Sequence, residues 1–210
     1  MYQLCDGIKF LKSLPDNSVD GIFMDPPWGS GPAIKGQKIW KKLIRHVANE
    51  CPRILKPRAR VLIWVGSRML SDTIKAVGGG LEYKHLLLCK YIPPRYIGCY
   101  FSDHDPILYF SRPGEKMYYR KGKYIPQAFM KPSTGKKDTR HPCARPIEIV
   151  SKLLHLFFKP GEYIIDPFAG SDTTGYACRD LGIKYDTCEI DPEMYKTGIS
   201  RNSQNFFDLS

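Results

Sequence analysis

A carboxylate, two prolines and an aromatic ring stand together in Asp25, Pro26, Pro27 and Trp28, directly after the apolar run 19–24. The Asp25 carboxylate can accept a hydrogen bond from an exocyclic amine. The main-chain carbonyl of Pro26 can accept a second, because proline fixes φ and leaves that oxygen facing outward. The Trp28 ring can stack on a planar base, and two acceptors on one amino group favour a lone pair turned out of the ring plane. The tetrapeptide therefore predicts methyl transfer to an amine on a planar ring.

A turn near the carboxyl terminus has the pattern of a nucleotide-binding site. A strand is expected at 159–165, Asp166 follows it, and Gly170 in the next turn lets the backbone approach a ligand closely. A second strand at 183–189 ends in Glu189, at about the spacing from Asp166 at which a carboxylate reaches ribose hydroxyls in dinucleotide folds. An aspartate before prolines is also a common exit from a sheet, so the first tetrapeptide alone leaves a structural role open.

Four ordered segments resemble the permuted beta group of S-adenosylmethionine-dependent DNA amino-methyltransferases. The sequence DPPW at 25–28 precedes DPFAGS at 166–171, which is the motif order of that group. The segment HPCARP at 141–146 is similar to the group's HPxxKP, and the opening at 4–20 is similar to its first motif. The resemblance implies an α/β, Rossmann-like class I methyltransferase with circularly permuted motif order. Its sheet should have seven mostly parallel strands, with helices on both faces.

The resemblance also implies a cofactor, a substrate and three parts of the chain. S-adenosyl-L-methionine would donate a methyl group directly to the N6 amine of an adenine that has left the DNA stack. Residues 1–110 would form the catalytic half, 111–140 a small basic target-recognition insert, and 141–210 the cofactor-binding half. The residues implied to bind the cofactor are Asp6, Asp25, His141, Arg145, Asp166, Phe168, Ala169, Gly170, Ser171, Thr173, Thr174, Glu189 and Ile190.

One residue departs from the family pattern. Where the group has a second glycine, this chain has Asp172. If a helix begins at Thr173, Asp172 stands at the position of an N-cap, and aspartate is a preferred capping residue. We therefore expect Asp172 to cap the helix, although its carboxylate would otherwise stand near the methionine end of the cofactor.

The predicted insert carries most of the excess positive charge. Between 111 and 140, nine lysines and arginines stand against Glu115 and Asp138, and aromatic residues alternate with them. Cations with aromatic rings suit phosphate contact and base stacking, whereas a solvated loop is the structural alternative. The residues expected to contact DNA are Arg112, Arg120, Lys121, Lys123, Lys131, Lys136 and Lys137.

Composition agrees with a polyanionic partner. The net charge is +11, and the seven cysteines form no metal-ligand pattern, so neither a bound metal nor a disulfide framework is expected. No apolar run approaches the roughly 18 residues of a membrane span. We expect a cytoplasmic protein of a bacterial, archaeal or phage-infected cell. The resemblance allows a homodimer, although no interface can be identified in the sequence. His104 and Asp105 take the place of a His-Glu pair that shapes the pocket in the family, and a structural role is favoured over metal binding with His85.

Hydrophobic periodicity and turn residues predict the order of elements. A loop is expected at 29–38, followed by a helix over 39–55 that Pro52 ends early. Strands at 83–91 and 105–111 are expected to form an antiparallel pair across a loop that contains Pro93 and Pro94. The other expected helices are 6–14, 67–77, 145–158 and 192–203, and the other expected strands are 19–24 and 60–65.

Three alternatives to the adenine assignment stay open. Cytosine-N4 enzymes use the same motif but more often begin it with serine, so Asp25 favours adenine. RNA adenine methyltransferases also carry Asp-Pro-Pro-Trp, although the DPFAGS motif and Glu189 are more similar to the DNA group. An inactive, nucleic-acid-binding subunit is the third alternative, and Asp172 is the feature that favours it.

Overall fold

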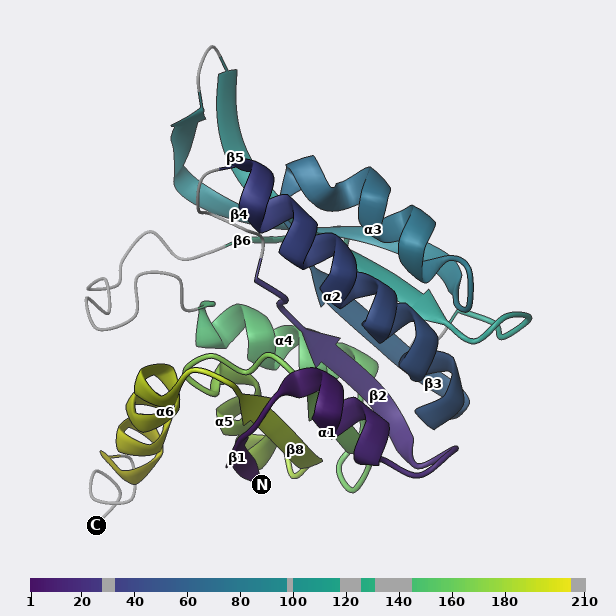
Figure 1. Ribbon diagram of the computed structural model, residues 1–210. Coiled ribbons are helices and arrows are strands. Elements are labelled where there is room, and N and C mark those ends of the chain that lie inside the picture. Colours follow the sequence, from purple (N-terminus) through teal and green to yellow (C-terminus); the bar gives the residue numbers. More distant parts are fainter. Residues whose placement is uncertain (28–32, 98–99, 118–125, 131–144, 205–210) are drawn as a thin grey trace.

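The computed structural model describes the backbone of residues 1–27, 33–97, 100–117, 126–130 and 145–204 (Figure 1). Within these ranges the side chains are described for 1–27, 40–90, 103–117, 126–129 and 145–200.

Eight strands of the described chain form one mixed sheet in the order β1-β8-β7-β2-β3-β5-β4-β6. The neighbours from β1 to β3 are parallel, β5 is antiparallel to both β3 and β4, and β6 is parallel to β4. The strands are β1 (Tyr2–Leu4), β2 (Val19–Met24), β3 (Leu55–Trp64), β4 (Glu82–Ile97), β5 (Tyr100–Ser111), β6 (Ala128–Met130), β7 (Tyr163–Asp166) and β8 (Lys184–Glu189). Strands β8 and β7 from the carboxyl-terminal part of the chain therefore lie between β1 and β2 from its amino-terminal part.

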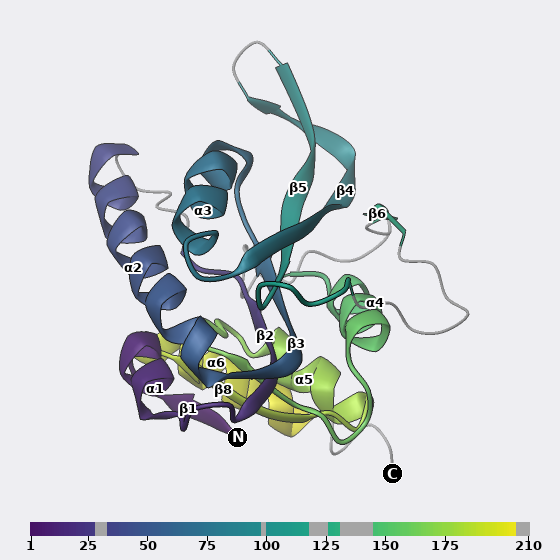
Figure 2. The same cartoon turned by 90° about the vertical axis from the view of Figure 1, so that its right-hand side faces the viewer.

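Helices cover both faces of this sheet. Figure 2 shows α1, α2 and α3 on one side of the strands and α4 and α5 on the other. The helices are α1 (Gly7–Ser13), α2 (Ala33–Ile54), α3 (Leu70–Val77), α4 (Ile147–Phe157), α5 (Thr173–Asp180) and α6 (Pro192–Gln204), with a 3-10 turn η1 (Ser67–Met69) before α3. The sixth helix packs beside β1, where the rings of Tyr2 and Tyr195 are 4.7 Å apart. The predicted fold class is confirmed, with one strand more than expected.

The alternation of side chains along the central strands divides the core in two. In β2, Ile22 and Met24 pack against α1 and α2, whereas Phe23, between them, packs against α4. A strand that is buried on both faces has to be apolar at nearly every position, which explains the run of the sequence here. Position 21 requires a glycine, because a Cβ there would lie 2.0 Å from the ring of Phe158.

The helix α2 begins earlier and ends later than expected. Residues 33–38, predicted to be part of a loop, are helical, and Pro52 lies inside the helix. A proline in the last turn removes only one hydrogen bond, and the buried face that includes Trp40, Ile44 and Val47 outweighs that loss. The remaining predicted loop residues, 29–32, lie outside the described part.

The strand pair is also longer than expected. Pro93 and Pro94 lie within β4, not in a loop. The register between β4 and β5 shifts between Lys90 and Arg95, and such an irregularity accommodates prolines, which cannot donate to a sheet ladder. The short strands β1 and β6 were not predicted, because three residues carry too little periodicity. No helix among the described residues is long and apolar enough to cross a membrane.

Candidate active site

The predicted site residues gather at one edge of the sheet. Parallel strands end on the same side, so Asp25 after β2, Asp166 at the end of β7 and Glu189 at the end of β8 share this edge. The strand β5 runs the other way and brings Asp105 to the same edge, opposite Cys89 of β4. This is the region in which open α/β sheets bind their ligands.

The carboxylate of Asp25 is held by a residue 120 positions away in the sequence. The guanidinium group of Arg145, just before α4, donates to both oxygens of Asp25, from Nε at 2.6 Å and from Nη2 at 2.9 Å. The Nη1 atom of Arg145 donates to Asp105 at 3.2 Å. The Cζ atom of the guanidinium lies over the Trp64 ring, 4.7 Å from its centroid. One arginine therefore joins β2, β5 and the start of α4.

The charges of this group favour the ionised pair. Burial by itself lowers the pKa of Arg145, but the carboxylates of Asp25 and Asp105 outweigh it and raise that pKa above its ordinary value. The side chains are largely enclosed, with 17% of Arg145 and 23% of Asp25 exposed. A bidentate pair in such surroundings holds the Asp25 carboxylate in one orientation.

The rest of the tetrapeptide is described in part. Pro26 is buried and Pro27 is exposed, while Trp28 lies outside the described residues. The accepting role of the Pro26 carbonyl and the stacking role of Trp28 therefore stay predictions.

The turn after β7 is organised by Asp166. Its Oδ1 accepts from the backbone N–H of Phe168 at 2.9 Å, and its Oδ2 accepts from the Thr174 hydroxyl at 2.6 Å. Burial raises the pKa of Asp166 to about 8, although these two hydrogen bonds oppose the rise and the nearby charges of Asp25 and Asp172 add to it. The carboxyl group thus ties the end of β7 to the start of α5.

Glu189 and Tyr2 hold the other side of this turn. One oxygen of Glu189 accepts from the N–H of Gly170 at 2.9 Å, and the other accepts from the N–H of Asp191 at 2.8 Å. The hydroxyl of Tyr2 donates to the carbonyl of Gly170 at 2.5 Å. Gly170 has a φ of 56°, a left-handed value that favours glycine. Tyr2 was not predicted, since a lone tyrosine in a three-residue strand gives no pattern.

Asp172 has the predicted position but not the predicted role. It precedes α5 as its N-cap residue, yet its side chain makes no capping hydrogen bond. Instead it is fully buried and accepts from the Thr187 hydroxyl on β8 at 2.7 Å. Its φ of 59° is left-handed. In that conformation the carboxylate oxygens, together with the Tyr185 ring, occupy the space where a Cβ of Gly175 would lie. A side chain fixed by β8 is not available to the amides of the helix.

Asp6 is a helix cap in this structure. Its Oδ1 accepts from the N–H groups of Ile8 and Lys9 at 2.8 and 3.0 Å, at the start of α1. Since β1 ends beside β8, with the N–H of Cys5 donating to the Glu189 carbonyl at 2.9 Å, Asp6 also lies at the site edge. Its predicted approach to the adenine of a cofactor stays a prediction.

The other predicted cofactor residues differ in their exposure. Ser171, Thr173 and Thr174 are buried, Phe168 and Ala169 are half-buried, and Ile190 is 64% exposed. His141 lies outside the described residues. Ala169 donates through its backbone N–H to the Cys188 carbonyl at 2.9 Å, which fixes the turn to β8.

Most of the predicted DNA-contacting residues fall outside the described part. These residues are Arg120, Lys121, Lys123, Lys131, Lys136 and Lys137. Arg112 is described, and its Nη1 donates to Asn17 at 2.9 Å and to the Leu55 carbonyl at 3.1 Å. Asn17 precedes β2 and Leu55 begins β3, so Arg112 lies at the opposite edge of the sheet from Asp25. The chain that flanks 131–144, by contrast, lies at the site edge on both sides, at Met130 and Arg145.

The histidines of this region do not form a joint site. His104 pairs across the strands with Lys90, and its Nδ1 lies 2.6 Å from Asp103, whereas His85 lies opposite Tyr109. No group of three or more His, Cys, Asp or Glu side chains in the described ranges is arranged to hold a metal ion. Asp105, by its contact with Arg145, does help to shape the region around Asp25.

Comparison with known proteins agrees with this geometry. Residues 19–200 match the family model for N6/N4 methyltransferases, which is described as DNA methylase. The chain belongs to this DNA methylase family. The "DNA adenine methyltransferase YhdJ" of Escherichia coli (strain K12) is 27% identical over 235 residues, which cover 93% of this chain and 80% of the relative. The "Type II methyltransferase M2.DpnII" of Streptococcus pneumoniae is 25% identical over 236 residues, which cover 93% and 87%.

Solved structures of DNA methylases have the same fold. The crystal structure of the M1.HpyAVI-SAM complex superposes with a TM-score of 0.78 at 24% identity, covering 96% of this chain and 99% of the other. The PvuII DNA methyltransferase, which is named cytosine-N4-specific, gives a TM-score of 0.77 at 16% identity, covering 95% and 85%. At these identities the similarity establishes the architecture of the sheet and helices.

For a DNA methylase, the unexpected feature is how Asp25 is supported. The sequence places Arg145 in the segment that resembles HPxxKP, and the structure brings it onto the DPPW carboxylate. Trp64 was not predicted to take part, because its place at the end of an apolar strand is typical of a core residue.

Proposed function

We propose that this protein transfers a methyl group from S-adenosyl-L-methionine to the N6 amino group of an adenine in DNA. The observation that carries the proposal is that the Asp25 carboxylate and the Asp166–Glu189 turn share one edge of the sheet. Membership of the DNA methylase family supports the reaction class. Asp25 in place of serine favours adenine, and a relative named as an adenine enzyme supports this choice.

The residues of the turn fit the proposed cofactor. Glu189 is half-buried, and each of its oxygens accepts one backbone N–H, so each retains capacity to accept a ribose hydroxyl. The carboxylates of Asp25 and Glu189 bring negative charge to this edge, which suits a cofactor that carries a sulfonium and an ammonium group. When bound, S-adenosylmethionine supplies an electrophilic methyl group.

Residues of this chain would then position the target amine. The adenine has to leave the duplex stack, since its amine is otherwise paired. Asp25 would accept one hydrogen bond from the amine, the Pro26 carbonyl would accept another, and Trp28 would stack on the ring. The protein would contribute orientation and electrostatics, without a covalent bond to the base.

DNA contact is assigned to the basic residues that follow β6 and precede Arg145. Lys131, Lys136 and Lys137 lie in the segment whose two described flanks are at the site edge. Arg120, Lys121 and Lys123 belong to the same proposed insert, 111–140. Arg112 is omitted from this proposal, because its guanidinium is engaged at the far edge of the sheet.

The test is transfer of labelled methyl from S-adenosylmethionine to DNA and, in parallel, to RNA, with the modified nucleoside identified by mass. N6-methyladenine in DNA supports the proposal. N4-methylcytosine would keep the geometry but refute the base, and label only in RNA would refute the substrate. No label with folded protein would refute the activity and favour an inactive nucleic-acid-binding subunit.

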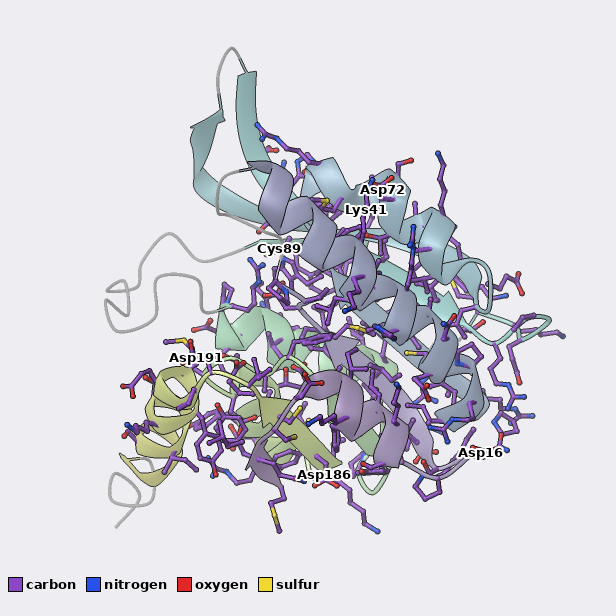
Figure 3. The ribbon with its side chains drawn as sticks, viewed as in Figure 1. Asp16, Lys41, Asp72, Cys89, Asp186 and Asp191 are labelled. Atoms are coloured by element: carbon purple, nitrogen blue, oxygen red, sulfur yellow. The ribbon has the colours of Figure 1, made fainter. Side chains whose placement is uncertain are left out.

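The variant Asp25→Asn tests the role of the carboxylate. We expect the rate of methyl transfer to fall at least about 100-fold while cofactor binding, measured by calorimetry, is kept. The matched control is Asp16→Asn, since Asp16 is a paired but exposed aspartate away from the site (Figure 3). Full activity of Asp25→Asn would contradict the proposed mechanism.

A further inference from the structure

The inference concerns how the carboxylate at the centre of the site is kept ionised and oriented. Both oxygens of Asp25 accept from one guanidinium, at 2.6 and 2.9 Å. Two charge-assisted hydrogen bonds from one planar donor fix the plane in which a carboxylate lies. The pair with Arg145 therefore sets the orientation that the proposed role of Asp25 requires.

The guanidinium is itself restrained on two further sides. Asp105 accepts from its third nitrogen at 3.2 Å, and its Cζ atom lies over the Trp64 ring, 4.7 Å from the ring centroid. Asp105 is only 10% exposed, and Trp64 is 1% exposed. A planar cation that contacts a carboxylate at each end and a ring on one face has little freedom to rotate. Its position, and with it that of Asp25, is set by β3 and β5.

The charges around the site indicate what the Arg145 cation contributes. Asp105 on β5 and Asp166 on β7 carry acidic groups that interact with Arg145 and Asp25, and Cys89 on β4 adds a thiol beside the arginine. Without the guanidinium, Asp25 would lose an adjacent opposite charge that favours its ionised form in a largely enclosed region. A protonated Asp25 would carry an O–H donor and would be a weaker acceptor for the amine.

We propose that Arg145 is a positioning residue for methyl transfer, which holds Asp25 ionised and oriented through the Asp105–Arg145–Asp25 arrangement on Trp64. This role differs from the cofactor contact expected of the segment that contains Arg145, and it rests on the proposed function of Asp25. The segment after the basic insert would in this way link the DNA-contacting part of the chain to the reacting group.

Two variants separate charge from geometry. Arg145→Met removes both the charge and the bidentate contact. We expect kcat to fall about 100-fold, since misplacement of reacting groups lowers rates by that order. The KM for S-adenosylmethionine should change by less than about threefold. The acidic limb of the pH–rate profile should move up by about one to three pH units. Arg145→Lys keeps the charge but cannot donate in the same bidentate manner, so the acidic limb should stay while kcat falls about tenfold.

The matched control is Arg60→Met. Arg60 is 4% exposed, pairs with Glu162 and lies 4.8 Å from the Phe158 ring centroid, away from Asp25. Loss of this buried arginine should lower stability without moving the pH profile at a temperature where the variant is folded. A profile that moves equally in both variants would refute the specific role of Arg145.

A readout independent of activity completes the test. The carboxyl carbon of Asp25, assigned in a ¹³C-labelled protein by comparison with Asp25→Asn, should titrate at higher pH in Arg145→Met than in the wild type. Equal titration would overturn the inference even if the wild type methylates DNA. An altered titration in a protein that transfers no methyl would instead support the inference about Asp25 and refute the proposed function. A raised KM for the cofactor with unchanged kcat would assign Arg145 to cofactor binding.

Discussion

The contact between the start of α1 and the turn after β7 allows a prediction with a magnitude. A Cβ added at Gly7 would lie 2.3 Å from the carbonyl oxygen of Pro167 and 3.0 Å from the ring of Phe168. Ordinary contact begins at 3.4 Å, so the backbone around Pro167 would have to move by about 1 Å in Gly7→Ala. The obstacle is main chain, which cannot rotate away as a side chain can.

Opposing terms decide the expected stability of Gly7→Ala. Overpacking a well-packed site costs about 1–3 kcal/mol, with backbone obstacles at the upper end, whereas alanine gains about 0.5–1 kcal/mol over glycine within a helix. The net loss should be about 2 kcal/mol in the free energy of unfolding. For a chain of this length that corresponds to a fall in Tm of about 4–8 °C. Urea titration and calorimetry measure both quantities.

The same displacement should weaken cofactor binding. Pro167 and Phe168 lead into the turn whose Gly170 N–H is held by Glu189. We expect the affinity for S-adenosylmethionine to fall about tenfold, measured by calorimetry at a temperature where Gly7→Ala is folded. The control is Gly79→Ala, where the nearest atom to an added Cβ is 3.7 Å away, and both quantities should stay near wild type. Wild-type stability of Gly7→Ala would refute the close packing of α1 on this turn, and reduced stability with full affinity would refute its role in binding.

The remaining predictions concern the two buried aspartates of the turn. The folded protein keeps a proton on Asp166 up to about pH 8, whereas the unfolded chain releases it near pH 4. The contribution of Asp166 to the free energy of unfolding therefore falls as the pH rises from about 4 to about 8, and it is constant above pH 8. Asp166→Asn should remove this fall, which amounts to up to about 1.4 kcal/mol per pH unit. Urea titrations of the wild type and the variant at several pH values measure it, and an identical pH dependence would contradict the raised pKa of Asp166. Asp172→Gly should relieve a left-handed backbone, worth about 1 kcal/mol, but lose the hydrogen bond from Thr187, worth about 1.5–3 kcal/mol. We expect a net loss of about 1 kcal/mol in the free energy of unfolding, and a rate of methyl transfer that changes less than about twofold. Activity that appears only in Asp172→Gly would show that Asp172 inactivates the natural chain.

The order of the helices and of the strands other than β1 and β6, and the edge at which the site lies, could be predicted from the sequence. The run 19–24, the DPFAGS turn and the strand that ends in Glu189 are local patterns, and parallel strands bring their carboxyl ends together whatever the details of packing. The helix boundary at Thr173 was predicted for the same reason. The boundaries of α2 and β4 were not, because the glycine and proline residues inside these elements are local signals for a loop or a helix end.

What each polar side chain of the site contacts was decided by tertiary structure alone. Asp172 was predicted to cap α5 because capping is a local interaction, but Thr187 on β8 provides a buried partner that no local pattern reveals. The sequence by itself determined the reaction class through short motifs whose residues act side by side. The pairing of Arg145 with Asp25 and Asp105 depends on three segments that meet only when the sheet forms, since the partners of a guanidinium are set by position in space and not by spacing along the chain.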